Sequence, residues 1–324
     1  MADMRAIVVE GGKGAAEALR LETQPCPEPG PGEIRIAVKA AGVNRPDLLQ
    51  RLGLYPPPPG APSTLGLEVA GVVERGAGRW REGDAVCALL GGGGYAERAV
   101  CDARHALPLP PGFDFVQAAS LPETVFTVFA NLFESGGLKA GETALIHGAT
   151  SGIGVTAIQL AKAAGARVIA TGRGADKARA ALALGADLAI DASAEDFVDA
   201  VRRAGGADVV LDMVGGDYFA RNLEVLRPCG RLSCIAALAG GTVQLPIGLM
   251  MQKRLVITGS TLRPRTADEK ARLAGEVERL VWPWLAQGQI KPVIDRTFPL
   301  AEAAQAHARL EHGAHVGKVV LTIA

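Results

Sequence analysis

A glycine-rich run of seven residues, Gly148-Ala149-Thr150-Ser151-Gly152-Ile153-Gly154, stands between an apolar strand pattern and a helical pattern. In a βαβ unit such a turn brings backbone N–H groups to a pyrophosphate at the helix N-terminus. The fingerprint positions normally held by glycine are Ala149, Ser151 and Gly154 here, so a strict G-x-G-x-x-G is absent. The plain alternative is a tight βα loop. We predict that a dinucleotide is bound at this turn by Ser151, Gly152, Ile153 and Gly154.

The end of the next strand indicates which dinucleotide would bind. An acidic residue about 20 positions after the turn is typical of NAD-binding domains, because it bonds the ribose hydroxyls. This chain has Gly172-Arg173 there, followed by Lys177. A guanidinium and an ammonium group one helical turn apart can bind a 2′-phosphate. The residues therefore favour NADPH, with NADH as the alternative cofactor. The plain alternative for Arg173 and Lys177 is a solvated helix start that binds no phosphate.

The elements that must position these residues change character near residue 120. Before it, polar and apolar residues alternate with the period of half-buried strands, and Pro and Gly clusters separate them, which suggests a small barrel. After it, near-continuous apolar strands alternate with helices, which predicts a doubly wound α/β domain with a parallel sheet. The early strands are expected over 4–9, 32–39, 68–74 and 84–90. The later strands are expected over 143–147, 167–171, 188–190, 207–211, 231–235, 255–258 and 317–322, and the helices over 118–133, 154–164, 176–184 and 268–287.

Composition excludes several classes of protein. Lys+Arg and Asp+Glu number 34 each, so no charge excess recruits nucleic acid or a membrane surface. Five dispersed cysteines without a C-x-x-C pair suit a reducing cytoplasm better than a disulfide scaffold. The uncharged stretch 232–252 contains Gly240, Gly241 and Pro246, so we expect a buried strand followed by a loop rather than a membrane span. The N-terminal segment lacks the pattern of a signal peptide, and we expect a cytoplasmic protein.

Three runs of residues carry a resemblance to a known family. They are 41–51 (AGVNRPDLLQR), 53–57 (GLYPP) and 65–71 (LGLEVAG). In order and spacing they resemble the medium-chain dehydrogenase/reductase superfamily, and in particular its zinc-free quinone oxidoreductase branch (zeta-crystallin relatives and the tumour-suppressor-inducible subgroup). The resemblance implies a GroES-like β-barrel catalytic domain over 1–122, completed by 263–324, and a Rossmann domain over 123–262. It also implies a site in the cleft between these domains and a homodimer.

Departures from zinc-dependent members of the superfamily narrow the chemistry. Asn44 stands where those enzymes place a cysteine zinc ligand, and Leu67 stands where they have a histidine. The lobe that would hold a structural zinc is replaced by four glycines at 91–94. Leucine cannot coordinate zinc, which needs three or four N, S or O ligands. The resemblance therefore implies a protein without a catalytic metal, whose substrate must already be electrophilic, as a quinone or an activated alkene is.

The resemblance also assigns roles to individual residues. It implies that Asn44 and Tyr55 are the polar groups nearest the nicotinamide and the substrate, where Asn44 bonds a ribose hydroxyl and Tyr55 bonds a quinone oxygen or relays a proton. The simpler readings are a turn-forming Asn44 and a Tyr55 packed against the proline run. Other positions implied to contact the cofactor are Thr127, Val214, Gly215, Ala236 and Lys318. For Lys318 the alternative is a charge on an edge strand.

The histidines do not form a catalytic or metal-binding pattern. His147 ends a strand just before the nucleotide turn, where we expect a structural hydrogen-bonding role. His307, near the end of the chain, is expected in a turn or in the tail. The leading interpretation is an NADPH-dependent quinone oxidoreductase that transfers a hydride or electrons without a metal. The alternatives are a reductase of activated C=C bonds in enones or enoyl groups, and an NADPH-binding protein without catalysis.

Overall fold

The computed structural model describes residues 2–324. The chain forms two compact units. The first unit contains the chain up to Thr124 together with Arg263–Gln287 and Pro292–Ala324. The second unit contains Val125–Leu262 and the short segment Gly288–Lys291. The first unit is thus assembled from both ends of the sequence, and the second is almost entirely continuous.

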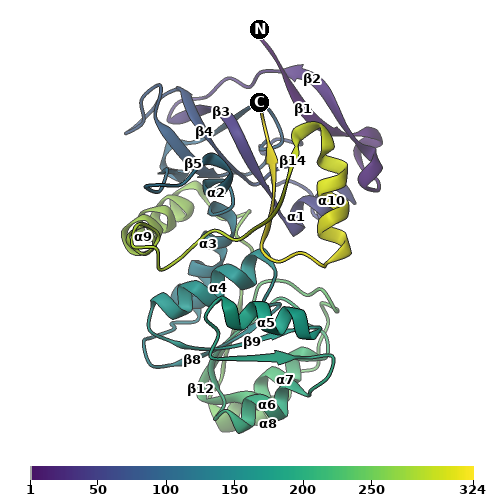
Figure 1. Ribbon diagram of the computed structural model, residues 1–324, viewed down its shortest axis with the longest axis vertical. Coiled ribbons are helices and arrows are strands. Elements are labelled where there is room, and N and C mark those ends of the chain that lie inside the picture. The colour runs from purple at the N-terminus through teal and green to yellow at the C-terminus, as the bar shows by residue number, and fades with distance from the viewer. Residues whose placement is uncertain (1) are drawn as a thin grey trace. The chain divides into compact units, whose positions relative to one another are not determined.

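The first unit is built on a seven-stranded sheet in the order β14-β15-β3-β4-β5-β7, with β6 paired to β3. Figure 1 labels its strands β3, β4, β5 and β14. Its strands are β3 (Glu33–Val43), β4 (Glu68–Arg75), β5 (Ala85–Leu89), β6 (Arg98–Asp102), β7 (Ala106–Pro108), β14 (Ile294–Pro299) and β15 (Lys318–Thr322). A separate antiparallel pair is formed by β1 (Asp3–Val9) and β2 (Leu19–Pro25). The parallel pair β14-β15 comes from the end of the sequence, and β15 lies between β14 and β3.

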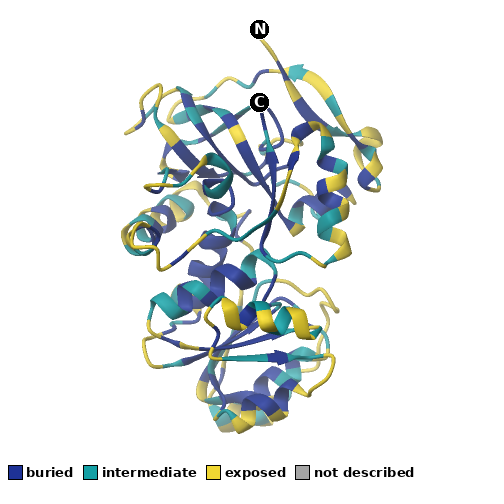
Figure 2. Ribbon diagram, viewed as in Figure 1, coloured by how far each residue is buried: buried dark blue, intermediate teal, exposed yellow. Residues whose placement is uncertain are grey.

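Alternation along β3 explains why this sheet has an inner face. Ile34, Ile36 and Val38 are buried, and the residues between them are more exposed. They pack with apolar residues of β4, β5 and β15 into one core, which Figure 2 shows as dark strands. Burying such side chains contributes about 1.5–3 kcal/mol each. The helices of the unit are α1 (Arg45–Arg51), α2 (Phe115–Ala118), α9 (Ala267–Ala286) and α10 (Ala303–His312), and its 3-10 turns are η1 (Glu10–Gly12), η2 (Ala16–Ala18), η3 (Ala103–His105) and η5 (Leu300–Glu302).

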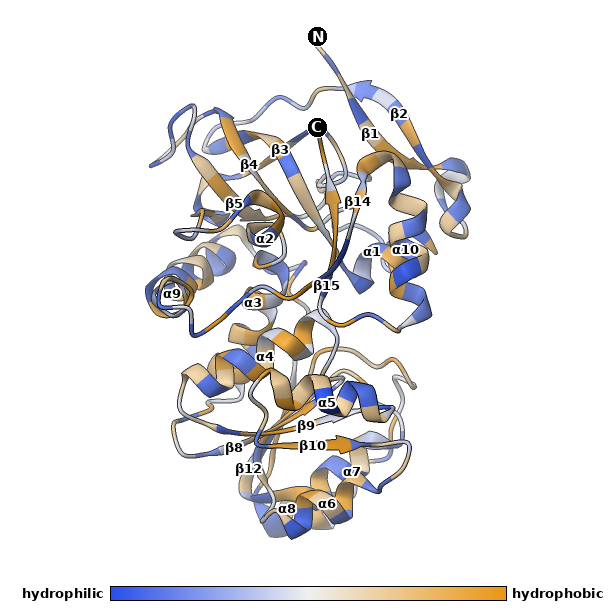
Figure 3. Cartoon of the chain, in the orientation of Figure 1, coloured by the Kyte–Doolittle hydropathy of each residue, from blue (hydrophilic) through white to orange (hydrophobic). Residues whose placement is uncertain are grey.

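The second unit contains a six-stranded parallel sheet in the order β10-β9-β8-β11-β12-β13. Its strands are β8 (Thr143–His147), β9 (Arg167–Gly172), β10 (Leu188–Asp191), β11 (Ala207–Asp212), β12 (Leu226–Cys234) and β13 (Val256–Gly259). The inner strands β8 and β11 are largely apolar, as expected for strands covered on both faces. The neighbouring strands β9 and β10 show the same hydrophobic character in Figure 3. The order reverses after β8-β9-β10, where β11 adds on the other side of β8, which is the topology of a doubly wound domain.

Helices cover both faces of this parallel sheet (Figure 1). On one face lie α4 (Gly152–Ala163) and α5 (Ala175–Ala183), and on the other α6 (Phe197–Arg203), α7 (Tyr218–Val225) and α8 (Ile247–Lys253). The chain enters the unit through α3 (Pro122–Val128), which continues into the π-helical segment η4 (Phe129–Ser135). The predicted fold class, a β-rich unit and a doubly wound α/β unit, is confirmed.

Two sequence predictions differ from the structure. The helix expected over 118–133 is interrupted, because Pro122 has no N–H to donate and begins a new helix, α3. The loop expected after β12 contains the helix α8. His307, expected in a turn or in the tail, lies in the tail, within α10. No helix within residues 2–324 is both long enough and apolar enough to cross a membrane.

Candidate functional site

Strand register brings three distant polar residues of the first unit together. Val319 on β15 pairs with Val43 on β3, so Lys318 lies beside Asn44, the residue that follows β3. Ala41 on β3 pairs with Val69 on β4, which places Glu68 beside the same strand end. An added Cβ on Gly42 would lie 2.0 Å from Glu68 Oε1, so glycine is required for this close approach.

The three side chains form a buried hydrogen-bonded cluster. Lys318 Nζ lies 2.6 Å from Glu68 Oε1 and donates to Asn44 Oδ1 at 2.5 Å. Asn44 Nδ2 donates to Glu68 Oε1 at 2.8 Å. Glu68 is fully buried, and Asn44 and Lys318 are about 95% buried. The backbone N–H of Glu123, at the start of α3, donates to Glu68 Oε2 at 2.8 Å.

The cluster fixes the orientation of the Asn44 amide. Lysine only donates and carboxylate only accepts, so Oδ1 must face Lys318 and Nδ2 must face Glu68. The second N–H of this amide has no partner among residues 2–324. Asn44 is also the N-cap residue of α1, so it takes part both in the turn and in the buried cluster. The edge-strand alternative for Lys318 is wrong, because β15 is an inner strand and its lysine is buried.

Tyr55 follows α1 and is half-buried. The Arg263 guanidinium carbon lies 5.6 Å from the centre of its ring. Burial raises the pKa of the Tyr55 hydroxyl, the positive charge of Arg263 opposes this shift, and Glu123 adds to it. Among residues 2–324 the hydroxyl has no hydrogen-bond partner, so it is available to a substrate oxygen. Within the same residues, no hydrogen bond joins Tyr55 to the Asn44 cluster.

In the second unit, the predicted nucleotide turn has the geometry of an anion site. Ser151 is the N-cap of α4, and its Oγ accepts from Gly154 N at 2.9 Å. The amides of Gly152 and Ile153 occupy the first turn, where no helical carbonyl is available, and both residues are partly exposed. An added Cβ on Gly154 would lie 2.2 Å from the carbonyl oxygen of Gly148. The turn therefore fits a pyrophosphate.

The basic residues predicted to bind a 2′-phosphate lie where β9 passes into α5. Arg173 is exposed, and an added Cβ on Gly172 would approach Lys177 Cβ to 2.9 Å, so Lys177 packs over the glycine. The nearby acid Asp191, at the end of β10, accepts hydrogen bonds from Ser193 and from Gly174 N, which lower its pKa. Its carboxylate is thus engaged with the adjacent loop.

A buried polar network fixes the ends of β8, β9 and β11. His147 lies 2.8 Å from Thr171 Oγ1 and 2.7 Å from Asn222 Oδ1. Asn222 Nδ2 donates to Asp212 Oδ2 at 3.1 Å, so its oxygen faces His147, whose Nε2 must donate. Burial lowers the pKa of His147, and the ring is held neutral. The predicted structural role of His147 is confirmed.

This network positions two of the residues predicted to line a nicotinamide pocket. Asp212 Oδ1 accepts from Val214 N at 2.7 Å and from Gly215 N at 3.2 Å. Gly215 has a φ of +66°, and an added Cβ would lie 2.8 Å from the carbonyl oxygen of Gly240. Ala236 follows β12 and is exposed. Small residues are needed here because the two loops approach each other closely.

Thr127 lies on α3 and is buried. Its carbonyl oxygen accepts from Asn131 Nδ2 at 2.9 Å, and Asn131 Oδ1 accepts from Ser260 Oγ and Ser233 Oγ. The π-helical segment η4 widens the backbone at Asn131, where Gly136 N donates to its carbonyl five residues back. Thr127 is thereby tied to β12 and to the segment after β13.

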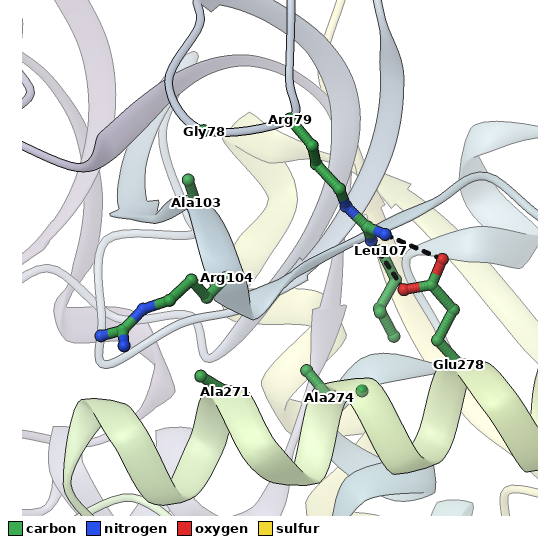
Figure 4. Close-up of a pocket in the computed structure, with 9 residues that line it drawn as sticks. Gly78, Arg79, Ala103, Arg104, Leu107, Ala271, Ala274 and Glu278 are labelled. Atoms are coloured by element: carbon green, nitrogen blue, oxygen red, sulfur yellow. Dashed lines mark hydrogen bonds and ion pairs between the residues drawn. The ribbon is translucent and has the colours of Figure 1, made fainter.

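The first unit contains two cavities. One, of about 320 Å³, lies against α9, where Arg79 and Glu278 form a two-pronged ion pair (Figure 4). The other, of about 630 Å³, is lined by prolines of the 56–62 loop and by Arg263. Neither cavity is lined by Asn44, Tyr55 or Lys318.

Several residues of the buried networks were not among the sequence predictions. Glu68 and Asp212 lie on strands that apolar patterns identify, whereas Asp47 and Asn222 lie on the helices α1 and α7, which the sequence did not predict. The available signal was a charged or amide residue beside an apolar run, since a fully buried charge must be paired. Their partners come from distant parts of the sequence, which spacing alone does not reveal.

Comparisons with known proteins match this architecture. Residues 30–111 match the family model for the alcohol dehydrogenase GroES-like domain, and residues 184–321 match the model described as zinc-binding dehydrogenase. Quinone oxidoreductase of Pseudomonas aeruginosa is 36% identical over 316 residues, 95% of this chain and 96% of that protein. Quinone oxidoreductase of Rattus norvegicus is 31% identical over 319 residues, covering 96% and 95%.

A solved structure agrees with these relatives over the whole chain. The structure of Escherichia coli quinone oxidoreductase complexed with NADPH superposes with a TM-score of 0.87 at 31% identity, covering 99% of this chain and 100% of that one. The chain therefore belongs to the quinone oxidoreductase group of the medium-chain dehydrogenase/reductase superfamily, and it is an oxidoreductase with a GroES-like and a Rossmann domain.

The buried ion pair allows a direct test of how the first unit is held together. Lys318→Met leaves Glu68 buried without a counter-charge, and Glu68→Gln leaves Lys318 in the same situation. Breaking a buried pair in this way costs about 3–5 kcal/mol. We expect each single variant to lose this much free energy of unfolding in urea titrations. The double variant should lose clearly less than the sum, and additive losses would contradict the coupling.

Proposed function

We propose that this protein reduces quinones with NADPH and uses no metal ion. The observation that carries the proposal is the Asn44 amide held by Glu68 and Lys318. By the family resemblance, a cysteine zinc ligand stands at this position in metal-dependent relatives. Leu67, beside Glu68, offers no ligand atom, and no cluster of three His, Cys, Asp or Glu side chains suited to a metal occurs within residues 2–324.

NADPH, when bound, supplies a hydride to an electrophilic acceptor. The chain's own part is binding and orientation. The first-turn amides of α4 would hold the pyrophosphate, and Arg173 with Lys177 would bind the 2′-phosphate. Val214 and Gly215, fixed by Asp212, would contact the nicotinamide, and the second N–H of Asn44 would bond a ribose hydroxyl. The relative whose structure contains NADPH supports this cofactor.

Reduction of a quinone also needs protons on its oxygens. The Tyr55 hydroxyl has no partner among residues 2–324 and has a raised pKa, so it stays protonated at neutral pH and can donate a hydrogen bond to a quinone oxygen. This is a smaller demand than protonation at carbon, which reduction of an enone would require.

The five cysteines all carry free thiols, which supports a cytoplasmic location.

The edge strand β13 supports a homodimer. β13 ends the parallel sheet, so among residues 2–324 one row of its backbone groups lacks a strand partner. Apolar side chains are exposed on β13 and on the segment before it, namely Leu238, Val243, Leu245, Ile247, Met251 and Val256. A surface of this kind is typical of a protein interface. A second copy of the chain, paired at β13 about a two-fold axis, would cover it.

The test of function is NADPH oxidation by metal-stripped protein with a panel of ortho- and para-quinones and enones. We expect oxidation with quinones, with no loss in the presence of a chelator and no gain on adding zinc. Activity that needs zinc would overturn the metal-free assignment. Turnover of enones alone would assign a C=C reductase, and tight NADPH binding without turnover of either class would assign a binding protein.

Cofactor choice is tested by Arg173→Ala. Loss of the guanidinium removes a charge-assisted contact to the 2′-phosphate, worth about 1.5–3 kcal/mol. We expect KM for NADPH to rise at least tenfold and KM for NADH to change less than twofold. Arg179→Ala is the matched control, because Arg179 is exposed on α5 and pairs with Asp176. Equal effects of Arg173→Ala on both cofactors would exclude the phosphate contact.

The dimer is tested by Val256→Lys, since Val256 is 52% exposed on β13. A charge in the interface of each copy would face its symmetry mate, so we expect a shift from dimer to monomer in light scattering coupled to size exclusion. Leu182→Lys is the control, because Leu182 is 50% exposed on α5, away from β13. An unchanged mass for Val256→Lys would contradict pairing at this edge.

A further inference from the structure

A chain of hydrogen bonds crosses the core of the first unit from α1 to the C-terminal helix α10. Tyr95 Oη lies 3.1 Å from Asp47 Oδ2 and 3.1 Å from His307 Nε2. His307 Nδ1 lies 3.3 Å from Arg51 Nη1, and Arg51 Nη2 donates to Glu311. The first four side chains are buried, and Glu311 is exposed at the surface. No step of the proposed reaction uses these hydrogen bonds.

The donors in the chain can be assigned from the groups themselves. Arg51 only donates, so His307 Nδ1 must accept. The neutral ring then carries its proton on Nε2 and donates to Tyr95, whose hydroxyl donates to Asp47. Burial and the charge of Arg51 lower the pKa of His307 to about 3, which keeps the ring neutral. Every hydrogen bond from Arg51 through His307 and Tyr95 therefore points toward the Asp47 carboxylate.

Asp47 connects these hydrogen bonds to the backbone of the candidate site. Its Oδ2 accepts from Asn44 N at 2.8 Å and its Oδ1 accepts from Gly66 N at 3.2 Å. These two amides belong to the segments that carry Asn44 and Glu68. Gly66 has a φ of +102°, and an added Cβ would lie 2.6 Å from the Tyr95 ring, so its backbone rests on that ring. One carboxylate thus fixes both sides of the Asn44 cluster.

We propose that His307 and Tyr95 are positioning residues for Asn44, acting through Asp47. The functional part of this inference rests on the proposed NADPH reaction. α10 supplies the N–H that orients Tyr95, Tyr95 holds Asp47, and Asp47 holds the backbone from which the Asn44 amide projects. Without the Tyr95 hydroxyl, Asp47 would keep its two amide donors but lose the donor that tethers it to α10.

The pKa of Asp47 is a measurable quantity that depends on this arrangement. Burial raises the pKa of Asp47 to about 6, and hydrogen bonds from Asn44 and Tyr95 and the charge of Lys318 oppose this rise. Arg263 also lies within electrostatic range. Removing the Tyr95 hydroxyl removes a donor to the charged form, so the pKa of Asp47 must rise. A protonated Asp47 can no longer accept from all three donors.

The experiment compares Tyr95→Phe and His307→Gln with His312→Gln in the full-length protein. Tyr95→Phe removes one hydroxyl, and His307→Gln keeps an N–H for Tyr95 while it loses the ring. His312 lies on the same helix but is exposed, and it is the control. In protein without cofactor, we expect amide hydrogen exchange at Asn44 and Gly66 to accelerate about tenfold in Tyr95→Phe, less in His307→Gln, and not in His312→Gln.

Kinetics then connect the position of Asn44 to the reaction. For Tyr95→Phe we expect KM for NADPH to rise roughly three- to tenfold with kcat changed less than twofold, and the acid limb of kcat/KM to move to higher pH. Exchange rates and pH profiles equal to those of His312→Gln would overturn the proposal. If the wild-type protein failed to oxidise NADPH while exchange responded as expected, the positioning role would stand and the proposed function would fall.

Discussion

A lysine and a glutamate buried together at the end of β3 are the constraint on which the first unit depends. Two charges removed from water are costly unless each finds a partner of good geometry. Lys318 and Glu68 meet this condition at 2.6 Å, with Asn44 bonded to both. The pair can form only if β15 lies beside β3 and β4 in one register. A slip of one residue would turn each side chain to the opposite face.

The second unit also buries a carboxylate, but it does so without an ion pair. Asp212 is buried at the end of β11 and is satisfied by two backbone amides and by Asn222. Asn222 is held in turn by the neutral ring of His147. In both units, therefore, a buried carboxylate gathers donors from several segments and holds irregular backbone in one conformation. Of the residues assigned to the cofactor, Asn44 and Lys318 contribute side chains to these networks, and Val214 and Gly215 contribute backbone amides.

Local patterns in the sequence predict most of the fold. Alternating residues identify β3, β4 and β5, and apolar runs identify the parallel strands, because burial on one face or two leaves a direct trace in the sequence. The apolar pattern continues across Pro122 and hides the break that this residue makes. β14 and α10 leave a weak trace, since their apolar residues are few and their partners lie far away in the chain. An edge position for Lys318 stayed open, because strand order cannot be read from a single strand. The turn at Ser151 is evident from its own local chemistry, whereas the Glu68 and Asp47 networks depend on contacts that only the tertiary structure shows.

The division of the first unit between both ends of the sequence has a consequence for folding during synthesis. The parallel sheet of the second unit, from β8 to β13, is complete once residue 259 has left the ribosome. The strands β3 and β4 are synthesised earlier. Glu68 on β4 has no counter-charge until β15, which begins at Lys318, has been made. Domains usually fold in the order of synthesis. Here the later-encoded unit can close first, and the nascent barrel strands, with Glu68 unpaired, are the segments most exposed to misassembly or to chaperones in the meantime.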